Sequence, residues 1–181
     1  MRKLNHITLF FILSLLVSCF GGSIEKRGSV KSYQNGVVQT IGGAFRVGKL
    51  SKAWVQKSID YRAVLFEHQG DHSTIMVDSW CKGAFDDGAL SDLARHLYRG
   101  IEGFKITSEE DFTLDNRAAL HTQGQGRLDG VGVYFSSAVV KINGCVVDFV
   151  YLSVPERMPS HSDFMPFVQG FEFLKGPKVL E

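Results

Sequence analysis

Two long β-branched runs, joined by Asn143-Gly144, limit the possible folds of this chain more than any other pattern in it. The runs Val131–Ile142 and Cys145–Val154 are rich in valine and aromatic residues, and Asn-Gly is the preferred two-residue type I′ turn of a β-hairpin. This turn sets a register in which Ile142 lies opposite Cys145. Both faces of the pair are largely apolar near the turn, so we predict a central hairpin with cover on both sides of the sheet.

Asp148 is the exception within the second of these runs. A carboxylate in an apolar strand needs either a partner or contact with water. We therefore expect an ion pair with a residue such as Lys141, or exposure of Asp148 near a sheet edge.

Further strands and two helices are predicted from the spacing of apolar residues. Apolar residues recur at helical spacing over Leu90–Ile101, which predicts the first helix. Ser160 and Asp163 resemble a capping box for a short C-terminal helix, and the alternative is that this helix begins near Phe164. The glycine-rich stretch 124–132 is predicted to be a mobile loop, with a ligand contact as the alternative. Alternation predicts further strands at residues 37–41, 44–47, 53–55, 61–68, 73–80, 104–114 and 117–127.

The N-terminus has the pattern of an export signal. Arg2 and Lys3 precede a mostly apolar run, Leu4–Val17, which small residues follow. This run is shorter than the roughly 20 apolar residues that a transmembrane helix needs. We therefore predict a signal segment, with an uncut membrane anchor as the alternative.

Leu16-Val17-Ser18-Cys19 resembles the lipobox of bacterial lipoproteins. The resemblance implies a diacylglycerol on the sulfur of Cys19, cleavage before this residue, and acylation of the new amino group by a fatty acid such as palmitate. Phe20, in place of an aspartate, favours the outer membrane, with the protein facing the periplasm. A plain secreted protein with an incidental cysteine is the alternative.

These signals divide the chain into three parts. We predict a lipoprotein signal peptide at 1–18, a lipidated N-terminus with a flexible, polar tether at 19–42, and one globular domain at 43–181. The chain has 20 Lys and Arg residues against 19 Asp and Glu residues. This balance gives no sign of a nucleic-acid-binding surface, so we predict membrane attachment through Cys19 and an envelope protein as a possible partner.

Cys81 and Cys145 remain once Cys19 is assigned to the lipid. In an exported protein, two cysteines predict a disulfide. Two buried free thiols are the alternative, and a reactive thiol is a third.

His68, Asp71 and His72 form the only sequence cluster with metal-ligand character. Two imidazoles and a carboxylate around a turn could bind zinc, which needs three or four ligands. The alternative, which we favour, is a polar hairpin tip in which Gly70 and Asp71 form the turn. We predict no cofactor, and Ser136 lacks the Gly-x-Ser-x-Gly elbow of a catalytic serine.

The element order also resembles a known fold. The order of predicted elements is similar to that of Mog1/PsbP-like domains. It consists of strands, one helix at Leu90–Ile101, a long antiparallel meander that includes Arg117–Ala119, and an aromatic ending at Phe167–Leu174. The resemblance covers about Gly43 to Leu174. It implies an α+β fold in which helices flank an antiparallel β-sheet, that is, a Mog1/PsbP-like α/β/α sandwich. It also implies a binding, assembly or accessory role.

Together these patterns predict a membrane-anchored cell-envelope lipoprotein whose domain is not an enzyme and binds an unidentified protein or small ligand. One alternative is an envelope hydrolase or metal-dependent enzyme that uses the region of His68, Asp71 and His72. A purely structural envelope protein is another.

Overall fold

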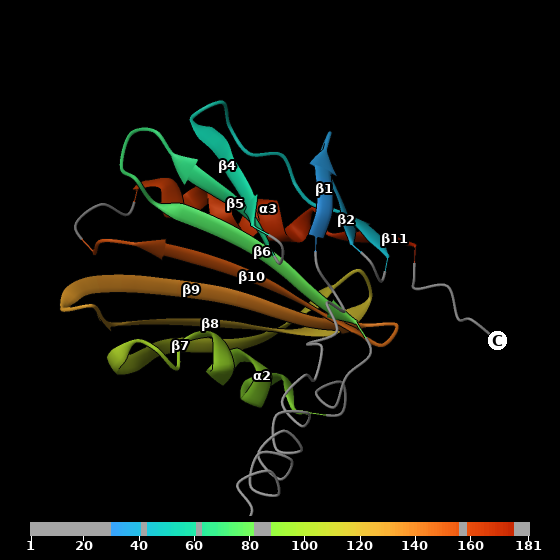
Figure 1. Cartoon of the computed structure of the whole chain (residues 1–181). Helices are drawn as coiled ribbons and strands as arrows, with labels where there is room; N and C mark the ends of the chain where they lie inside the picture. The colour runs from blue at the N-terminus through green and yellow to red at the C-terminus, as the bar shows by residue number, and fades with distance from the viewer. Residues whose placement is uncertain (1–29, 41–42, 61–62, 82–87, 156–158, 176–181) are drawn as a thin grey trace, which may run out of the picture.

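The computed structural model describes residues 30–40, 43–60, 63–81, 88–155 and 159–175, and these form two antiparallel sheets and two short helices (Figure 1). The four-stranded sheet A has the order β1-β2-β3-β11, and the seven-stranded sheet B has the order β4-β5-β6-β10-β9-β8-β7. Sheet A comprises β1 (Val30–Gln34), β2 (Val37–Thr40), β3 (Ala44–Arg46) and β11 (Glu172–Lys175). Sheet B comprises β4 (Trp54–Asp60), β5 (Ala63–His68), β6 (Thr74–Cys81), β7 (Glu102–Leu114), β8 (Arg117–Leu128), β9 (Val131–Ile142) and β10 (Cys145–Ser153).

The predicted central hairpin is confirmed as β9 and β10. Ile142 pairs with Cys145, and Val140 pairs with Val147. Asn143 has a φ of 51° and Gly144 a φ of 74°, the positive values that a type I′ turn requires at both positions. The strand order places β10 between β6 and β9, in the middle of sheet B.

The predicted α/β/α sandwich is wrong, because the described residues are mostly strand. Helix α2 (Leu90–Leu97) has 8 residues and α3 (Phe164–Gln169), which follows the 3₁₀ turn η1 (Pro159–Asp163), has 6. Helices this short cannot form complete layers over seven strands. Figure 1 shows α2 on one side of sheet B and α3 on the other, where sheet A supplies the rest of the cover through core residues such as Val38 and Phe45.

Sheet A begins inside the segment 19–42, for which the sequence predicted a tether. The strands β1 and β2 form a hairpin around Asn35-Gly36, whose φ values of 52° and 79° are again those of a type I′ turn. Val30 is 5% exposed, and the ring of Tyr33 meets the edge of Phe66 at a centroid distance of 5.1 Å. The described fold therefore begins at Val30.

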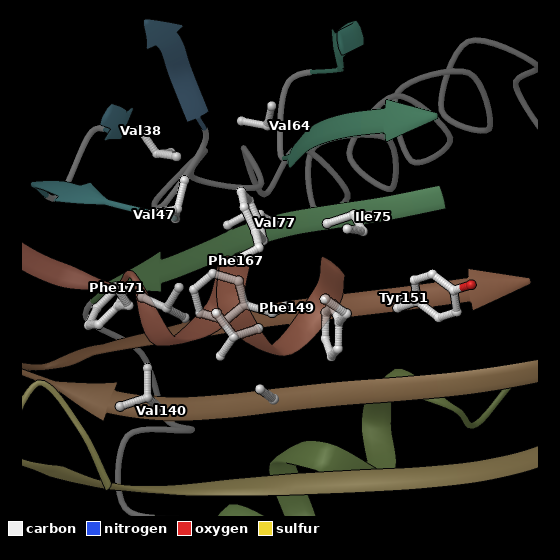
Figure 2. Close-up of a cluster of buried hydrophobic side chains, with 14 of the residues drawn as sticks. Val38, Val47, Val64, Ile75, Val77, Val140, Phe149, Tyr151, Phe167 and Phe171 are labelled. Atoms are coloured by element: carbon white, nitrogen blue, oxygen red, sulfur yellow. The ribbon is translucent and has the colours of Figure 1, made fainter. Parts of the chain in front are cut away.

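The C-terminal segment docks on sheet B through aromatic side chains and two glycines. The ring centroids of Phe167 and Phe171 lie 6.1 Å and 5.9 Å from that of Phe149 (Figure 2). The backbone N–H of Gly48 donates to the carbonyl of Phe167 over 2.8 Å. A Cβ added to Gly170 would lie 2.3 Å from the Cα of Gly48, so this close approach requires glycine at both positions.

The glycine-rich stretch 124–132 is a hairpin, so the prediction of a mobile loop is wrong. Strands β8 and β9 continue to a tight turn at Asp129-Gly130, where both φ values are positive. A Cβ on Gly124 would lie 2.4 Å from the ring of Phe104, and one on Gly126 would lie 2.5 Å from the Ile101 side chain. These two glycines therefore allow the segment after α2 to pack flat against β8.

Helix α2 positions the candidate site. It begins at Leu90, as predicted, but ends at Leu97 rather than at Ile101. Leu93 and Ala94 pack against apolar residues of β8, β9 and β10, namely Leu120, Val139 and Val146. Among the described residues, none of the helices has the length and apolar character needed to cross a membrane.

Candidate functional site

A pocket of about 260 Å³ lies between α2 and sheet B, and we call it the α2 pocket. Helix α2 packs over β8 and β9, and the pocket forms where the helix faces β10 and β6. Its lining is mostly apolar, with one imidazole and one carboxyl group. The lining residues are Trp80, Leu93, His96, Leu97, Val146 and Asp148.

Asp148 lies buried in the wall of the α2 pocket. Its side chain belongs to the central strand β10, the residue is 7% exposed, and its Oδ1 atom has no hydrogen-bond partner among the described residues. Both predicted explanations for this carboxyl are therefore wrong. The strand is not at an edge, and the Nζ of Lys141 donates instead to the carbonyl of Gly88 over 2.9 Å.

A second carboxyl group lies beside the first. Asp78 on β6 pairs directly with Asp148 on β10, and residues directly opposite in an antiparallel pair face the same side of the sheet. The Oδ1 of Asp78 accepts from the backbone N–H of Ser79 over 2.7 Å, and its Oδ2 accepts from the indole N–H of Trp80 over 2.9 Å. The buried, unsatisfied carboxyl in the pocket wall therefore has a hydrogen-bonded carboxyl as its cross-strand neighbour.

The electrostatics of Asp148 follow from this arrangement. Burial, and then the neighbouring Asp78 carboxylate, raise the pKa of Asp148 to about 7. At neutral pH the Asp148 carboxyl therefore exchanges between its protonated and ionised forms. Chemically, it can accept a cation or hold a proton.

The three residues predicted as a weak metal cluster do not converge on one point. His68 Nδ1 lies 2.9 Å from Asp71 Oδ1, whereas His72 Nδ1 lies 2.9 Å from Glu67 Oε1. Among the described residues, no group of three or more His, Cys, Asp and Glu side chains could hold a metal ion. These contacts are typical of a polar hairpin tip.

Asp71 ties this hairpin tip to the C-terminal segment. Its carboxylate accepts from the backbone N–H groups of Ser73, over 3.0 Å, and Ser160, over 3.4 Å. Burial alone would raise the pKa of Asp71, but the contacts with Ser160 and Ser73 and the nearby His68 imidazole lower it to about 2. The carboxylate is therefore a structural acceptor that links the turn between β5 and β6 to η1.

A second histidine cluster lies on the α3 side of sheet B. His121 Nε2 is 2.8 Å from Ser136 Oγ, and His161 Nε2 is 3.3 Å from the Tyr134 hydroxyl. Burial lowers the pKa of both imidazoles, and the neighbouring His161 lowers that of His121 further. Ser136 is fully buried, so this serine–histidine pair does not present a nucleophile to a substrate.

The two domain cysteines occupy directly opposed positions on neighbouring strands. The register pairs Cys81 of β6 directly with Cys145 of β10, which is 2% exposed. Directly opposed Cα atoms in antiparallel strands are about 4.5–5.5 Å apart, within the range that a disulfide spans. The side chain of Cys81 and all of Cys19 lie outside the described residues, so the disulfide and the lipid remain predictions.

Sequence reasoning missed the neighbours of Asp148. It identified a single acid in an apolar run, which was the correct signal, but it did not place Asp78 or Trp80 beside this acid. The indole of Trp80 is 45% exposed at the pocket. The pairing of β6 with β10, which places the two carboxyls together, joins strands separated by more than sixty positions.

Comparison with known proteins identifies the fold. LpqN, which is involved in cell envelope biogenesis of Mycobacterium tuberculosis, is 13% identical with a TM-score of 0.55, over 75% of this chain and 86% of that chain. CyanoP, the PsbP of Synechocystis sp. PCC 6803, is 14% identical with a TM-score of 0.54, over 88% and 99% of the two chains. No family model and no curated protein sequence matches the chain. The likenesses show a PsbP-like fold, as the sequence resemblance implied.

Proposed function

We propose that the chain is a lipid-anchored protein of the bacterial cell envelope, and that its domain binds a ligand or partner rather than catalysing a reaction. The observation that carries this proposal is the α2 pocket, where the Asp148 carboxyl is buried with an oxygen that no described residue hydrogen-bonds. Such a group weakens a fold unless something satisfies it. An apolar pocket with a perturbed titratable group is typical of a binding site.

The location in this proposal rests on the sequence around Cys19. Several acyl chains on one residue give a stable membrane anchor, whereas one chain binds only marginally. We propose that this lipid holds the protein at the outer membrane, with the domain facing the periplasm. The shared fold with LpqN, a protein of cell envelope biogenesis, fits this location.

Photocrosslinking in intact cells tests the binding role. A photoreactive amino acid at Trp80, in the pocket lining, is compared with one at Val131, which is 56% exposed and outside the lining. We expect a specific adduct from position 80 only, and mass spectrometry then shows whether it is a protein or a small molecule. Equal adducts at both positions, or none at position 80, would refute the proposal.

Fractionation tests the anchor. We expect the Cys19→Ala variant to move from the membrane to the soluble fraction and to lose incorporation of radiolabelled palmitate. A variant that remains in the membrane, with a wild-type protein that takes up no palmitate, would favour an uncut anchor instead.

The enzyme alternative gains no support from the contacts of His68, Asp71 and His72, because the two histidines contact different carboxylates. Metal analysis of the purified chain separates the two functions. Stoichiometric zinc that is lost in the His68→Ala, His72→Ala double variant would replace our proposal with a metal-dependent enzyme.

A further inference from the structure

We infer that the α2 pocket binds an alkylammonium group, which is a positively charged amine on an apolar stem. This inference rests on the proposed binding function and deepens it by naming the class of ligand. The group could belong to a free alkylamine or to a lysine side chain of a polypeptide, since the two share the same chemistry.

The sign of the charge follows from the pair of carboxyls. Asp148 and Asp78 lie directly opposite each other on β10 and β6, where Cβ atoms are about 4.5–5.5 Å apart. Two like charges at this spacing destabilise each other, and a cation bound in the pocket beside Asp148 offsets the repulsion. A ligand with a negative charge would increase it. The pocket therefore favours a cation.

The unsatisfied oxygen of Asp148 specifies a hydrogen-bond donor. Asp148 Oδ1 is buried and accepts no hydrogen bond from the described residues. An ionised carboxylate is an acceptor only, whereas an ammonium group offers three donors. A charge-assisted N–H···O bond is about twice as strong as a neutral one, so an ammonium group satisfies this oxygen better than a hydroxyl group.

The rest of the pocket specifies an apolar stem. Leu93, Leu97 and Val146 form its apolar walls, and Trp80 presents a partly exposed indole. Indole faces attract organic cations within about 6 Å of the ring centre. The volume of about 260 Å³ is below the roughly 300–1,000 Å³ typical of drug-sized sites. A single short alkyl chain therefore fits better than a larger ligand.

Isothermal titration of the full-length chain with three probes tests the class of ligand. The probes are hexylamine, hexanol and hexanoate, which share one stem and differ in the head group. At pH 8 we expect hexylamine to bind at least tenfold more tightly than hexanol. We expect Asp148→Asn to remove this preference, while Asp111→Asn, which changes an exposed carboxyl on β7, preserves it. Equal binding of hexylamine and hexanol, or an undiminished preference in Asp148→Asn, would overturn the inference.

A second measurement uses the wild-type protein alone, so it does not depend on the folding of a variant. An ammonium group favours the ionised form of Asp148, and binding at pH 7 should therefore release about half a proton per site into the buffer, because about half of the Asp148 groups are protonated at that pH. We expect the apparent affinity for hexylamine to fall about tenfold for each pH unit below 6. Binding that is independent of pH and releases no proton would overturn the inference.

Other ionisable groups share this side of the sheet. They are Asp78 on β6, Lys141 on β9 and His96 on α2, together with Glu109 and Asp111 on the more distant edge strand β7. Because His96 also lines the pocket, we expect His96→Gln to retain the pH dependence that Asp148→Asn removes. Loss of the pH dependence in His96→Gln, with retention in Asp148→Asn, would contradict the role of the carboxyl.

Competition distinguishes the two sources of the ammonium group. If Nα-acetyl-lysine methylamide displaces hexylamine, the pocket accepts a lysine side chain; if it does not, the ligand is a free amine. Stronger binding of hexanol or hexanoate than of hexylamine would overturn the inference and leave the pocket as a binding site. Absence of binding by all three probes, together with no crosslink from position 80, would refute both the inference and the proposed function.

Discussion

Ionisation of Asp148 should make the protein less stable as the pH rises. The pKa of this carboxyl increases from 3.8 to about 7 on folding, so the folded state binds more protons than the unfolded state between these values. Stability then falls with increasing pH. The loss begins near the unfolded pKa and is complete once the pH exceeds the folded one.

The magnitude follows from the two pKa values. Each pKa unit corresponds to about 1.4 kcal/mol, so a rise from 3.8 to about 7 gives a maximum cost of about 4 kcal/mol. At pH 5 the cost is about 2 kcal/mol, and at pH 8.5 it is close to the maximum. The Asp148→Asn variant has no ionisable group at this position and a similar side-chain volume, so it does not incur this cost.

Urea unfolding between pH 5 and pH 8.5 measures the effect. We expect the free energy of unfolding of the wild type, relative to Asp148→Asn, to fall by about 2–3 kcal/mol over this range. Subtracting the free energy of unfolding of Asp148→Asn from that of the wild type cancels the contribution of every ionisable group that the substitution leaves unchanged. Asp111→Asn, which alters an exposed carboxyl, serves as the control and should show no such trend. Parallel stability curves for the wild type and Asp148→Asn would show that folding does not raise the pKa of Asp148.

Three other predictions concern the fold. Gly48→Ala places a Cβ 2.5 Å from a backbone oxygen of α3, and urea unfolding should show a free energy of unfolding lower by about 3 kcal/mol. Gly100→Ala, whose Cβ would have nothing within 4 Å, is the control and should change this free energy little. Asp71→Ala leaves two backbone donors without their acceptor and should lower the free energy of unfolding by about 2–3 kcal/mol in the same assay at pH 7. An unchanged urea midpoint would contradict the structural role of the Asp71 carboxylate. Thiol titration of the denatured, unreduced protein should show Cys81 and Cys145 unreactive, and two reactive thiols would exclude the disulfide.

The parts of the fold that could be predicted from the sequence are those that local signals determine. Asn143-Gly144 and the β-branched runs around it predicted the hairpin and its register, because a two-residue turn fixes the pairing of its own strands. The start of α2 at Leu90 was predicted for the same reason, since the spacing of apolar residues in one segment suffices. Its end was not, because Ile101 continues the apolar spacing but packs as part of the segment after the helix.

The first strand of sheet A was missed although the signal of its turn was present, whereas the strands at 37–41 and 44–47 were predicted. Asn35-Gly36 is the same turn sequence that identified the central hairpin, but the polar residues around it favoured a tether. Its strands are short and half-exposed, so their sequence has few apolar residues, and they depend on contacts such as that of Tyr33 with Phe66. Because these contacts come from a distant segment, composition alone could not reveal them.

The candidate site required information that no local pattern contains. Asp148 could be identified as unusual, but its burial depends on the position of β10 within sheet B, and its neighbour depends on the pairing with β6. A single acid in an apolar strand is compatible with an ion pair, with an edge strand, and with a binding pocket. Long-range pairing excludes the edge strand and places the carboxyl in the wall of the α2 pocket.

The pH dependence of stability and the proposed binding of an amine are linked through the same group. If ionised Asp148 destabilises the free protein, an ammonium ligand that pairs with it must raise stability by an amount that grows with the ratio of ligand concentration to Kd. Hexylamine should therefore raise the melting temperature more at pH 8 than at pH 5.5, while hexanol should act equally at both. The pH midpoint of the affinity for hexylamine must also equal the folded pKa obtained from the unfolding data, because both report proton binding by the same free protein. Different midpoints would show that the group controlling stability is not the group that binds the ligand.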